Sequence, residues 1–449
     1  MTNNEKKQTL YAFFLNWISK FVTYILLVVF ANLYIKDSYG EATFIMAIFN
    51  ICLLLITIGL PFLFVPWAIR KKDIHSVFYF LFISTIIIVL VSSPLLIIKP
   101  WVYPLMIALP FVLLYNFGLS FLRVDHKYGL IQIFGISTVV ITLIVAILFK
   151  NLDKFAVVLA YALGYIISTI PLLYLERKYF LDLLSHFIIK ISVVKEYLAK
   201  GFMTSLVLLS FYFLGWIDST VLGVLSTYEN VANYNIASPI SNLISIIPIS
   251  ISTFLLTRVS ELRQENMQKN ILKRAIRISY FSSLILSMFI ILFLPLLIKI
   301  FFRNYVGIEP YVLILTMGIL FYSAYLLMYT HMAGKLEPEK AFLPMLLAAL
   351  LNIILDILLI PKFGLYGICV ATFLAHALAF TLLVIRLKLL KEYWYVYILP
   401  FGLLLSYLIG YYGILLIIFL IPLSFVFKLM TLEDIKVIKD TVFSMVNFK

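Results

Sequence analysis

The sequence predicts an all-α polytopic membrane protein with about 14 transmembrane helices. Of its 449 residues, 64% are hydrophobic and only 12% are charged, and the mean hydropathy is +1.09. No soluble core needs that much apolar surface. The apolar residues also fall into runs long enough to cross a bilayer, and the cationic residues gather in alternate connections between these runs.

The apolar runs can be laid along the chain in order. The first run, of about 26 residues, has no small-residue cleavage site, so it is expected to be retained as a span and not removed as a signal peptide. The fourteen expected spans cover residues 10–35, 40–69, 76–98, 101–122, 129–149, 154–175, 201–225, 229–257, 275–298, 310–333, 340–360, 364–385, 394–410 and 411–427.

The placement of charge predicts the topology. Of the 35 Lys and Arg residues, 27 lie at the termini, in the connections after even-numbered spans or at the span ends that adjoin them, seven lie at the corresponding places after odd-numbered spans, and the last is Lys20 within the first span. The positive-inside rule therefore places both termini in the cytoplasm of a plasma-membrane protein. The formal charge of +14 is explained by this topology and by attraction to anionic inner-leaflet lipid, so no nucleic-acid partner is expected.

The chain divides into four regions. LRVDHKYG and GKLEPEK each precede two spans, which suggests a duplicated half. We expect an N-terminal lobe over residues 1–175, a basic cytoplasmic linker over 176–200, a C-terminal lobe over 201–390, and a terminal helix pair with a tail over 391–449. Within the linker, Leu183 to Leu198 alternates apolar and charged residues, as an interfacial helix would.

Each lobe pairs a span that carries a charge with a span that is broken by proline. Lys20 lies in the first span, and Pro61 and Pro66 interrupt the second. Asp218 lies deep in the seventh span, and Pro239 and Pro248 interrupt the eighth. Charges and breaks both cost stability in lipid, so this arrangement indicates a transporter whose prolines act as hinges.

Three stretches carry a resemblance to a known family. They are NIILDILLIPKFGLYGICVATFLAHAL (352–378), WIDSTVLGVLSTYENVANYNIAS (216–238) and SYGEATFIMAIFNICLLLITIGL (38–60). The first contains N-x-x-L-D-x-x-L-I-P, a short linker and G-x-x-x-A-T. Together they resemble the polysaccharide transporters, the O-antigen and lipid-linked oligosaccharide flippases, of the multidrug/oligosaccharidyl-lipid/polysaccharide exporter superfamily.

This resemblance implies two six-helix lobes in a V, as in the multidrug exporters of the superfamily, with alternating access to the two membrane faces. It implies that the cargo is an isoprenoid diphosphate-linked oligosaccharide, moved to the outer leaflet for surface polysaccharide biosynthesis, with polysaccharide assembly proteins as further partners. Relatives in the superfamily flip peptidoglycan precursor or export cationic drugs. The protein is expected to act as a monomer.

The substrate-binding candidates are Lys20, Arg123, Asn16 and Asn50. Lys20 lies about ten residues, or roughly 15 Å, into its helix, where a cation costs about 2.5 to 3.5 kcal/mol. A diphosphate would stabilise it, since an ammonium group can bind phosphate as a point charge; the alternative is a snorkelling or internally paired lysine. Arg123, at the cytoplasmic end of the fourth span, either contributes or is an ordinary interfacial charge.

The ion-coupling candidates are Asp218, His376 and Asp356. Asp218 is expected either to pair with Lys20, to take up H⁺ or Na⁺, or to make a structural hydrogen bond. Asp356 is expected near the outer edge of its span, within reach of water, where a packing or hinge role competes with ion coupling. His376, close to mid-membrane, either carries protons or packs as a hydrogen-bonded side chain.

Two other function classes remain open. A cation-coupled multidrug exporter would need acidic residues in the N-terminal lobe, where none lies in mid-span. A membrane glycosyltransferase or polymerase would need a sizeable outer loop or a cluster of polar residues at one face, and the outer connections are short, so no enzyme activity is expected. Cys52 and Cys369 both fall within spans, with no zinc spacing and no other cofactor expected.

Overall fold

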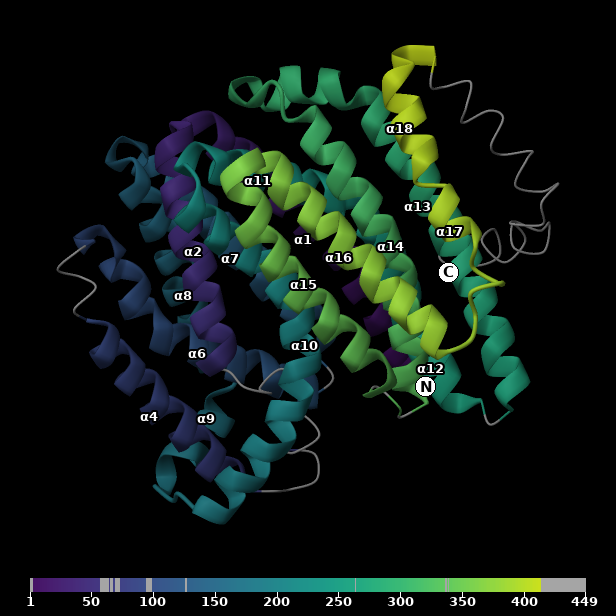
Figure 1. Ribbon diagram of the computed structural model, residues 1–449. Coiled ribbons are helices and arrows are strands. Elements are labelled where there is room, and N and C mark those ends of the chain that lie inside the picture. Colours follow the sequence, from purple (N-terminus) through teal and green to yellow (C-terminus); the bar gives the residue numbers. More distant parts are fainter. Residues whose placement is uncertain are drawn as a thin grey trace. The chain divides into compact units, whose positions relative to one another are not determined.

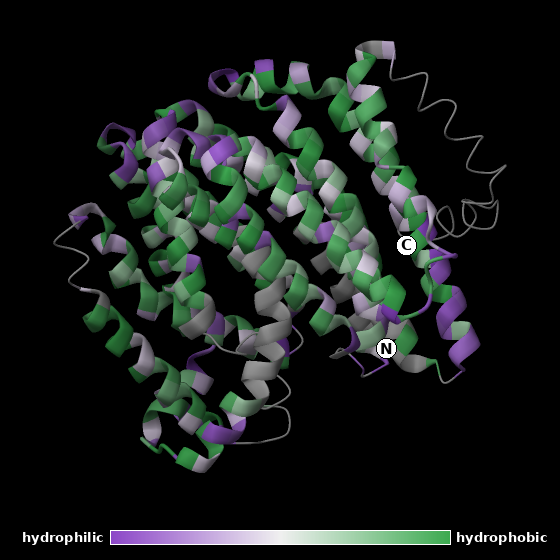
Figure 2. Cartoon of the chain, in the orientation of Figure 1, coloured by the Kyte–Doolittle hydropathy of each residue, from purple (hydrophilic) through white to green (hydrophobic). Residues whose placement is uncertain are grey.

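A computed structural model describes residues 3–56, 64, 68, 73–93, 99–125, 127–262, 264–335, 337 and 339–412. Helices and their connections make up this part of the chain, with no strand in it (Figure 1). Nine helices in these ranges are long and apolar enough to cross a membrane. Hydrophobic residues run along most helices, and hydrophilic ones gather toward helix ends and connections (Figure 2). The expected all-α polytopic class is confirmed.

Most helices of the described residues coincide with expected spans, but α10 and α13 each begin ten residues before the expected span, and the span expected over 394–410 is divided into two short helices, α17 and α18. Some expected spans fall partly or wholly outside the described residues, including most of 57–72 and all of 413–427. The α-helices are α1 (Asn3–Leu33), α2 (Lys36–Ile56), α4 (Ile74–Ser92), α6 (Tyr103–Val124), α7 (Tyr128–Leu148), α8 (Lys154–Leu175), α9 (Arg177–Ser185), α10 (Ile191–Leu225), α11 (Tyr228–Asn242), α12 (Ile246–Glu261), α13 (Glu265–Phe301), α14 (Glu309–Gly334), α15 (Glu339–Phe363), α16 (Leu365–Arg386), α17 (Tyr395–Ile398) and α18 (Phe401–Leu408). Short 3-10 turns include η1 (Pro100–Val102) and η3 (Leu243–Ser245).

The chain forms two compact units, Met1–Tyr212 and Phe213–Lys449. In unit 1, α1 packs on α7, and α8 packs on both α6 and α7. Buried aromatic rings fill its core, and Phe64 meets Phe117 edge to face at 5.1 Å between centroids. Such edge-to-face pairs stabilise a core beyond the area that they bury.

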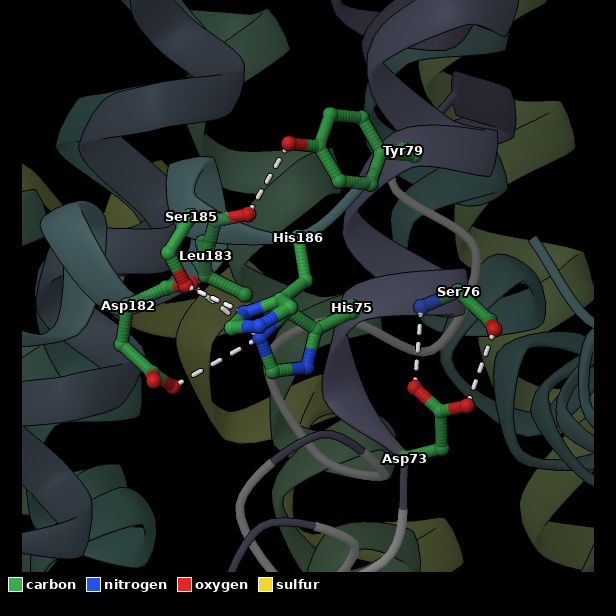
Figure 3. Close-up of polar contacts among 8 residues, drawn as sticks. All are labelled: Asp73, His75, Ser76, Tyr79, Asp182, Leu183, Ser185 and His186. Atoms are coloured by element: carbon green, nitrogen blue, oxygen red, sulfur yellow. Dashed lines mark hydrogen bonds and ion pairs between the residues drawn. The ribbon is translucent and has the colours of Figure 1, made fainter. Parts of the chain in front are cut away.

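The start of α4 is tied to the chain around α9 (Figure 3). Asp73 caps α4 by accepting the Ser76 backbone N–H at 3.1 Å. His75 lies 3.6 Å from the Asp182 carboxylate, and its ring meets His186 edge to face at 6.3 Å (Figure 3). These contacts join segments more than 100 residues apart and fix the end of unit 1 that the charge rule places in the cytoplasm.

The structure corrects one expectation about the linker. Residues 183–198 do not form one interfacial helix, because α9 ends at Ser185 and α10 begins at Ile191. Between them the chain is not helical, and the Lys190 backbone N–H donates to Ser76 Oγ at 2.9 Å. The apolar and charged alternation is therefore divided between two helices and a connection that is bonded to α4.

In unit 2, α14 lies at the centre and packs against α11, α12, α13 and α16. The expected break in the eighth span is present, because η3 interrupts the helix between α11 and α12. Pro239 lies inside α11, and Pro248 lies in the first turn of α12. Proline has no N–H, so Pro248 cannot donate the helical hydrogen bond to the Ile244 carbonyl oxygen, four residues earlier. That oxygen instead accepts a hydrogen bond from Ser283 Oγ at 3.5 Å.

Candidate functional site

A cluster of buried polar side chains lies where four helices of unit 2 supply residues to one place. Asp218 comes from α10 and is fully buried. Its Oδ2 accepts the Tyr234 hydroxyl from α11 and the Thr372 hydroxyl from α16, the latter at 2.7 Å. The Asp218 carboxyl group thus links α10 to both α11 and α16.

Asp356 and Asn352 on α15 face the same carboxylate. Both are buried, and each lies close enough to Asp218 to interact with it. The four-residue spacing puts them on one face of α15. Asp356 lies within the last two turns of α15, but the expectation that water reaches it was wrong, because α16 packs along α15 and the carboxyl group is fully buried.

The tight approach of α15 and α16 depends on two glycines. Gly364 joins the helices with φ at +54°, a conformation that residues with a Cβ rarely adopt. At Gly367, an added Cβ would lie 2.6 Å from the Leu359 carbonyl oxygen. Because Gly367 has no side chain, the backbones of α15 and α16 can come into contact at this point. Thr372 on α16 can then face the same carboxylate as Asp356 and Asn352 on α15.

Several polar atoms of the cluster are left without hydrogen bonds. Within the described ranges, Asp218 Oδ1, both carboxyl oxygens of Asp356, and Asn352 Nδ2 make no hydrogen bond of standard geometry, although the three side chains lie beside one another. Burying a polar atom without a partner is costly, and two adjacent carboxylates cannot both stay ionised without a compensating positive charge. The arrangement can therefore take up a proton or a small cation.

The chemistry of the cluster suits a hard cation better than zinc. Its remaining polar groups are neutral oxygens and an amide, which are the ligands that hard cations prefer. In the described part of the chain, no group of three or more His, Cys, Asp or Glu residues could hold a metal ion. Cys369 is buried nearby on α16, close enough for its thiol to interact electrostatically with the carboxyl groups of Asp218 and Asp356.

His376 is not brought onto the carboxylates. It lies one turn beyond Thr372 on α16, and its ring packs on Tyr322 with 5.2 Å between centroids. Gly318 makes room for it, since an added Cβ at that position would lie 3.2 Å from His376 Nδ1. The position of His376 fits the packing alternative, and its proton-carrying role stays a prediction.

The substrate-binding candidates lie on unit 1 and do not form a cluster with one another. Lys20 is exposed on α1, and no ion pair to it is found among the residues that the structure describes. Asn50 is half-buried on α2, and Arg123 is half-buried in the last turn of α6. The side chain of Asn16 lies outside the described part, as do the hinge candidates Pro61 and Pro66.

Sequence reasoning missed Tyr234 and Thr372 as members of the cluster. Thr372 closes the G-x-x-x-A-T motif, and Asn352 and Asp356 are the polar positions of N-x-x-L-D. The four-residue spacing of Asn352 and Asp356 could have marked them as neighbours. Nothing in the sequence indicated that Tyr234, on another helix, would donate to Asp218.

The chain is similar to a known protein family and to two curated proteins. A family model described as lipid II flippase MurJ matches residues 98–432. An uncharacterised membrane protein of Methanocaldococcus jannaschii is 28% identical over 181 residues, which cover 39% of this chain and 34% of the relative. A probable low-salt glycan biosynthesis flippase of Haloferax volcanii is 27% identical over 171 residues, covering 37% of this chain and 36% of the relative. The chain therefore matches only about a third of the length of these curated relatives.

Solved structures share the fold. A lipid II flippase in an inward closed conformation aligns with a TM-score of 0.75 over 92% of this chain and 98% of that one, at 19% identity. An inward-facing multidrug resistance transporter of the MATE family, in the MOP superfamily, aligns with a TM-score of 0.67 over 87% of this chain and 95% of that one, at 13% identity. At these identities the likeness concerns the fold alone.

Proposed function

Because this chain belongs to the lipid II flippase MurJ family, we propose that it moves an isoprenoid diphosphate-linked oligosaccharide from the cytoplasmic to the outer leaflet of the plasma membrane. Its class is a multi-pass membrane transporter of lipid-linked cargo. The observation that carries the proposal is the family match over residues 98–432. We further propose that the oligosaccharide is a precursor of a surface polysaccharide, which the glycan biosynthesis flippase among the relatives supports.

We propose that the Lys20 ammonium group binds the diphosphate of the cargo lipid. Because it is an exposed cation on a membrane helix, it is costly unless an anion or water compensates its charge. The charged head group must cross a low-dielectric region, and a fixed ammonium lowers that barrier. The membrane potential, negative inside, adds about 2.3 kcal/mol per charge per 100 mV in the outward direction.

We further propose that the cluster around Asp218 and Asp356 couples transport to H⁺ or Na⁺. The two buried carboxyl groups and the unpartnered oxygens of Asp356 support this role. Uptake of a cation would cancel the repulsion between the two carboxylates and draw α10 and α15 together. Alternating access then needs only that the cluster binds its cation more tightly in one state than in the other.

Proteoliposomes test the proposal. The purified protein should move a short-chain isoprenoid diphosphate oligosaccharide between leaflets, and the same assay with lipid II tells the two cargo classes apart. Lys20→Ala should abolish transport, while Lys20→Arg should retain it. Failure of the well-folded wild type with both lipids would overturn flippase function, and equal rates in all three proteins would remove Lys20 from it.

A cation-coupled multidrug exporter is the second candidate, since exporters of this kind share the fold. One observation counts against it. The two buried carboxylates among the described residues of unit 1 are already paired, Glu41 with Lys99 and Lys154 and Glu176 with Lys127, so neither offers a free negative charge to a cationic drug. Drug-driven release of protons from liposomes, in place of lipid movement, would favour this candidate.

A further inference from the structure

Two tyrosines one turn apart on α8 lie on the inner side of unit 1. Tyr161 and Tyr165 are half-buried, and they lie close enough for their side chains to interact. At about 3.6 residues per turn, the exposed side chains of Ile167, Ile170 and Tyr174 lie on the opposite side of the same helix. An exposed, largely apolar stripe on a membrane span faces lipid, so the two tyrosines face the other helices of unit 1.

The rings of both tyrosines pack on residues from other helices. Tyr161 meets Phe30 of α1 edge to face with 5.8 Å between centroids, and Tyr165 meets Tyr115 of α6 in the same way at 5.7 Å. The Tyr115 hydroxyl accepts a hydrogen bond from Thr138 Oγ1 of α7 at 3.2 Å. Among the residues that the structure describes, the Tyr161 and Tyr165 hydroxyls have no such partner. Packing therefore fixes the two rings and leaves their hydroxyl groups available.

The adjoining face of α1 is polar and open. Thr23 lies seven residues, or about two turns, before Phe30, so both are on the same face of the helix. Phe30 is buried, whereas Thr23 and Lys20 are exposed. The Thr23 hydroxyl donates to the Ser19 carbonyl oxygen at 2.8 Å, and its oxygen can still accept a hydrogen bond. Below the contact with Tyr161, this face of α1 thus offers polar groups that other side chains do not cover.

The two helices place these groups in a definite order across the membrane. Both α1 and α8 pack on α7, and the charge rule predicts that α1 runs outward and α8 inward. Measured from the contact between Phe30 and Tyr161, Tyr165 lies roughly 6 Å nearer the cytoplasm, at 1.5 Å per residue. On the same scale Thr23 lies roughly 10 Å and Lys20 roughly 15 Å nearer to it. The hydroxyl groups therefore follow Lys20 in the outward direction.

The chemistry of this face suits an uncharged ligand that is rich in hydroxyl groups. The sequence has no Asp or Glu in residues 15–33 of α1 or anywhere in α8. A cationic ligand would therefore find no carboxylate on these two segments. A tyrosine hydroxyl both donates and accepts hydrogen bonds, as a sugar hydroxyl does, so the two kinds of group can pair in either direction.

We propose that Tyr161, Tyr165 and Thr23 bind the sugar residues of the cargo that are joined to its diphosphate. The inference rests on the proposed flippase function, in which Lys20 binds the diphosphate, and it adds the part of unit 1 that contacts the glycan. In a lipid-linked oligosaccharide the sugars follow the diphosphate directly. A row of hydroxyl groups that follows Lys20 matches that order. Bound sugar would also supply the hydrogen-bond partners that the two tyrosine hydroxyls lack.

Binding of two probe lipids tests the inference. The purified protein in detergent would be titrated with a short-chain isoprenoid diphosphate oligosaccharide, and with the same isoprenoid diphosphate without sugar. Tyr161→Phe and Tyr165→Phe remove only a hydroxyl group, and each should weaken binding of the glycosylated lipid about fivefold, as expected for one hydrogen bond. Their binding of the sugar-free lipid should be unchanged. Lys20→Ala should weaken binding of both lipids, because both carry the diphosphate.

Two further variants make the test specific. Tyr174→Phe is the matched control, because this tyrosine lies on the exposed side of the same helix, and it should bind both lipids as the wild type does. Thr23→Val tests the face of α1 at an exposed position, where the substitution disturbs little packing. It should weaken binding of the glycosylated lipid only. Melting temperatures in detergent check that every variant is folded.

The inference is overturned if Tyr165→Phe binds the glycosylated lipid as well as Tyr174→Phe does. It is also overturned if the tyrosine variants weaken binding of both lipids alike, since the hydroxyl groups would then act on the diphosphate or on the packing of unit 1. Equal affinity of the wild type for the two lipids would overturn it and leave the flippase proposal standing, whereas a wild type that binds neither lipid would overturn both. Should the tyrosine variants unfold, unchanged binding by Thr23→Val overturns the inference.

Discussion

The Thr372 hydroxyl lies 2.7 Å from Asp218 Oδ2, although the two residues are 154 positions apart in the chain. The same hydroxyl lies 2.9 Å from the Ile368 carbonyl oxygen of its own helix, which it can reach as a donor instead. A single side chain thus links α16 to the carboxylate on α10. Because Asp218 is fully buried, each donor that it receives affects the stability of unit 2.

We expect Thr372→Val to destabilise the protein by about 1 to 3 kcal/mol, since it leaves a buried carboxylate oxygen with one donor fewer at nearly the same volume. Thr372→Ser keeps the hydroxyl and should cost less. Thermal unfolding in detergent measures both. Equal melting temperatures for the two variants would show that the hydrogen bond contributes nothing.

The carboxyl pair predicts a dependence of stability on cations. Adding Na⁺, at constant ionic strength and with K⁺ as the matched salt, should raise the melting temperature of the wild type if the cluster binds Na⁺. Asp356→Asn should remove this response, because it removes one of the two charges that hold the cation. Glu309→Gln, a carboxylate outside the cluster in the first turn of α14, is the control. If Na⁺ raised the melting temperature of Asp356→Asn as much as that of the wild type, the cation would bind outside this cluster.

Gly367→Ala should destabilise unit 2 by about 1 to 3 kcal/mol or more, because its Cβ would meet the Leu359 backbone, which cannot move cheaply. Gly402→Ala is the matched control, since its Cβ would have ordinary contact with Met288 Cε at 3.8 Å. The control should be neutral or slightly stabilising, as alanine favours a helix over glycine. Chemical unfolding of both variants checks this, and similar losses in the two would contradict it.

Acid should loosen the start of α4. Partial burial raises the pKa of Asp73, but hydrogen bonds from the Ser76 backbone N–H, Lys190 and Ser76 Oγ outweigh that effect and leave the pKa below its usual value. The stabilisation is therefore complete above the usual pKa of about 3.9 and is lost as the pH falls through the folded value. Hydrogen exchange across residues 73–79 should speed up in that range. In Asp73→Asn it should be fast at every pH, and an unchanged acid response in this variant would exclude Asp73 as its cause.

Glu41→Gln should destabilise unit 1, since it leaves Lys99 and Lys154 close together without their shared carboxylate. The double variant Glu41→Gln with Lys154→Gln removes one of the two repelling charges and should recover part of the loss. The melting temperatures of the single and double variants, read as a mutant cycle, measure this coupling. Simple additivity would mean that the cluster carries no net interaction.

Composition and spacing were enough to predict the helices. In the described residues, most expected spans coincide with helices because a bilayer requires about 20 apolar residues per helix, a rule that a single sequence displays directly. The break near Pro239 and Pro248 was predictable for a similarly local reason, since proline removes a backbone donor wherever it stands. The motifs of the sequence also predicted that the chain belongs to the multidrug/oligosaccharidyl-lipid/polysaccharide exporter superfamily.

Contacts between distant helices could not be predicted in the same way. The sequence marked Asp218 and Asp356 separately as charges in membrane spans. Only the packing of α16 on α15 and the donors from Tyr234 and Thr372 made them one buried cluster. The burial of Asp356, wrongly expected near water, also depends on that packing. Local sequence determines which segments enter the membrane, because the cost of apolar exposure adds up residue by residue. The tertiary structure decides which polar groups share a site, because that depends on the close approach of helices that glycines such as Gly367 permit.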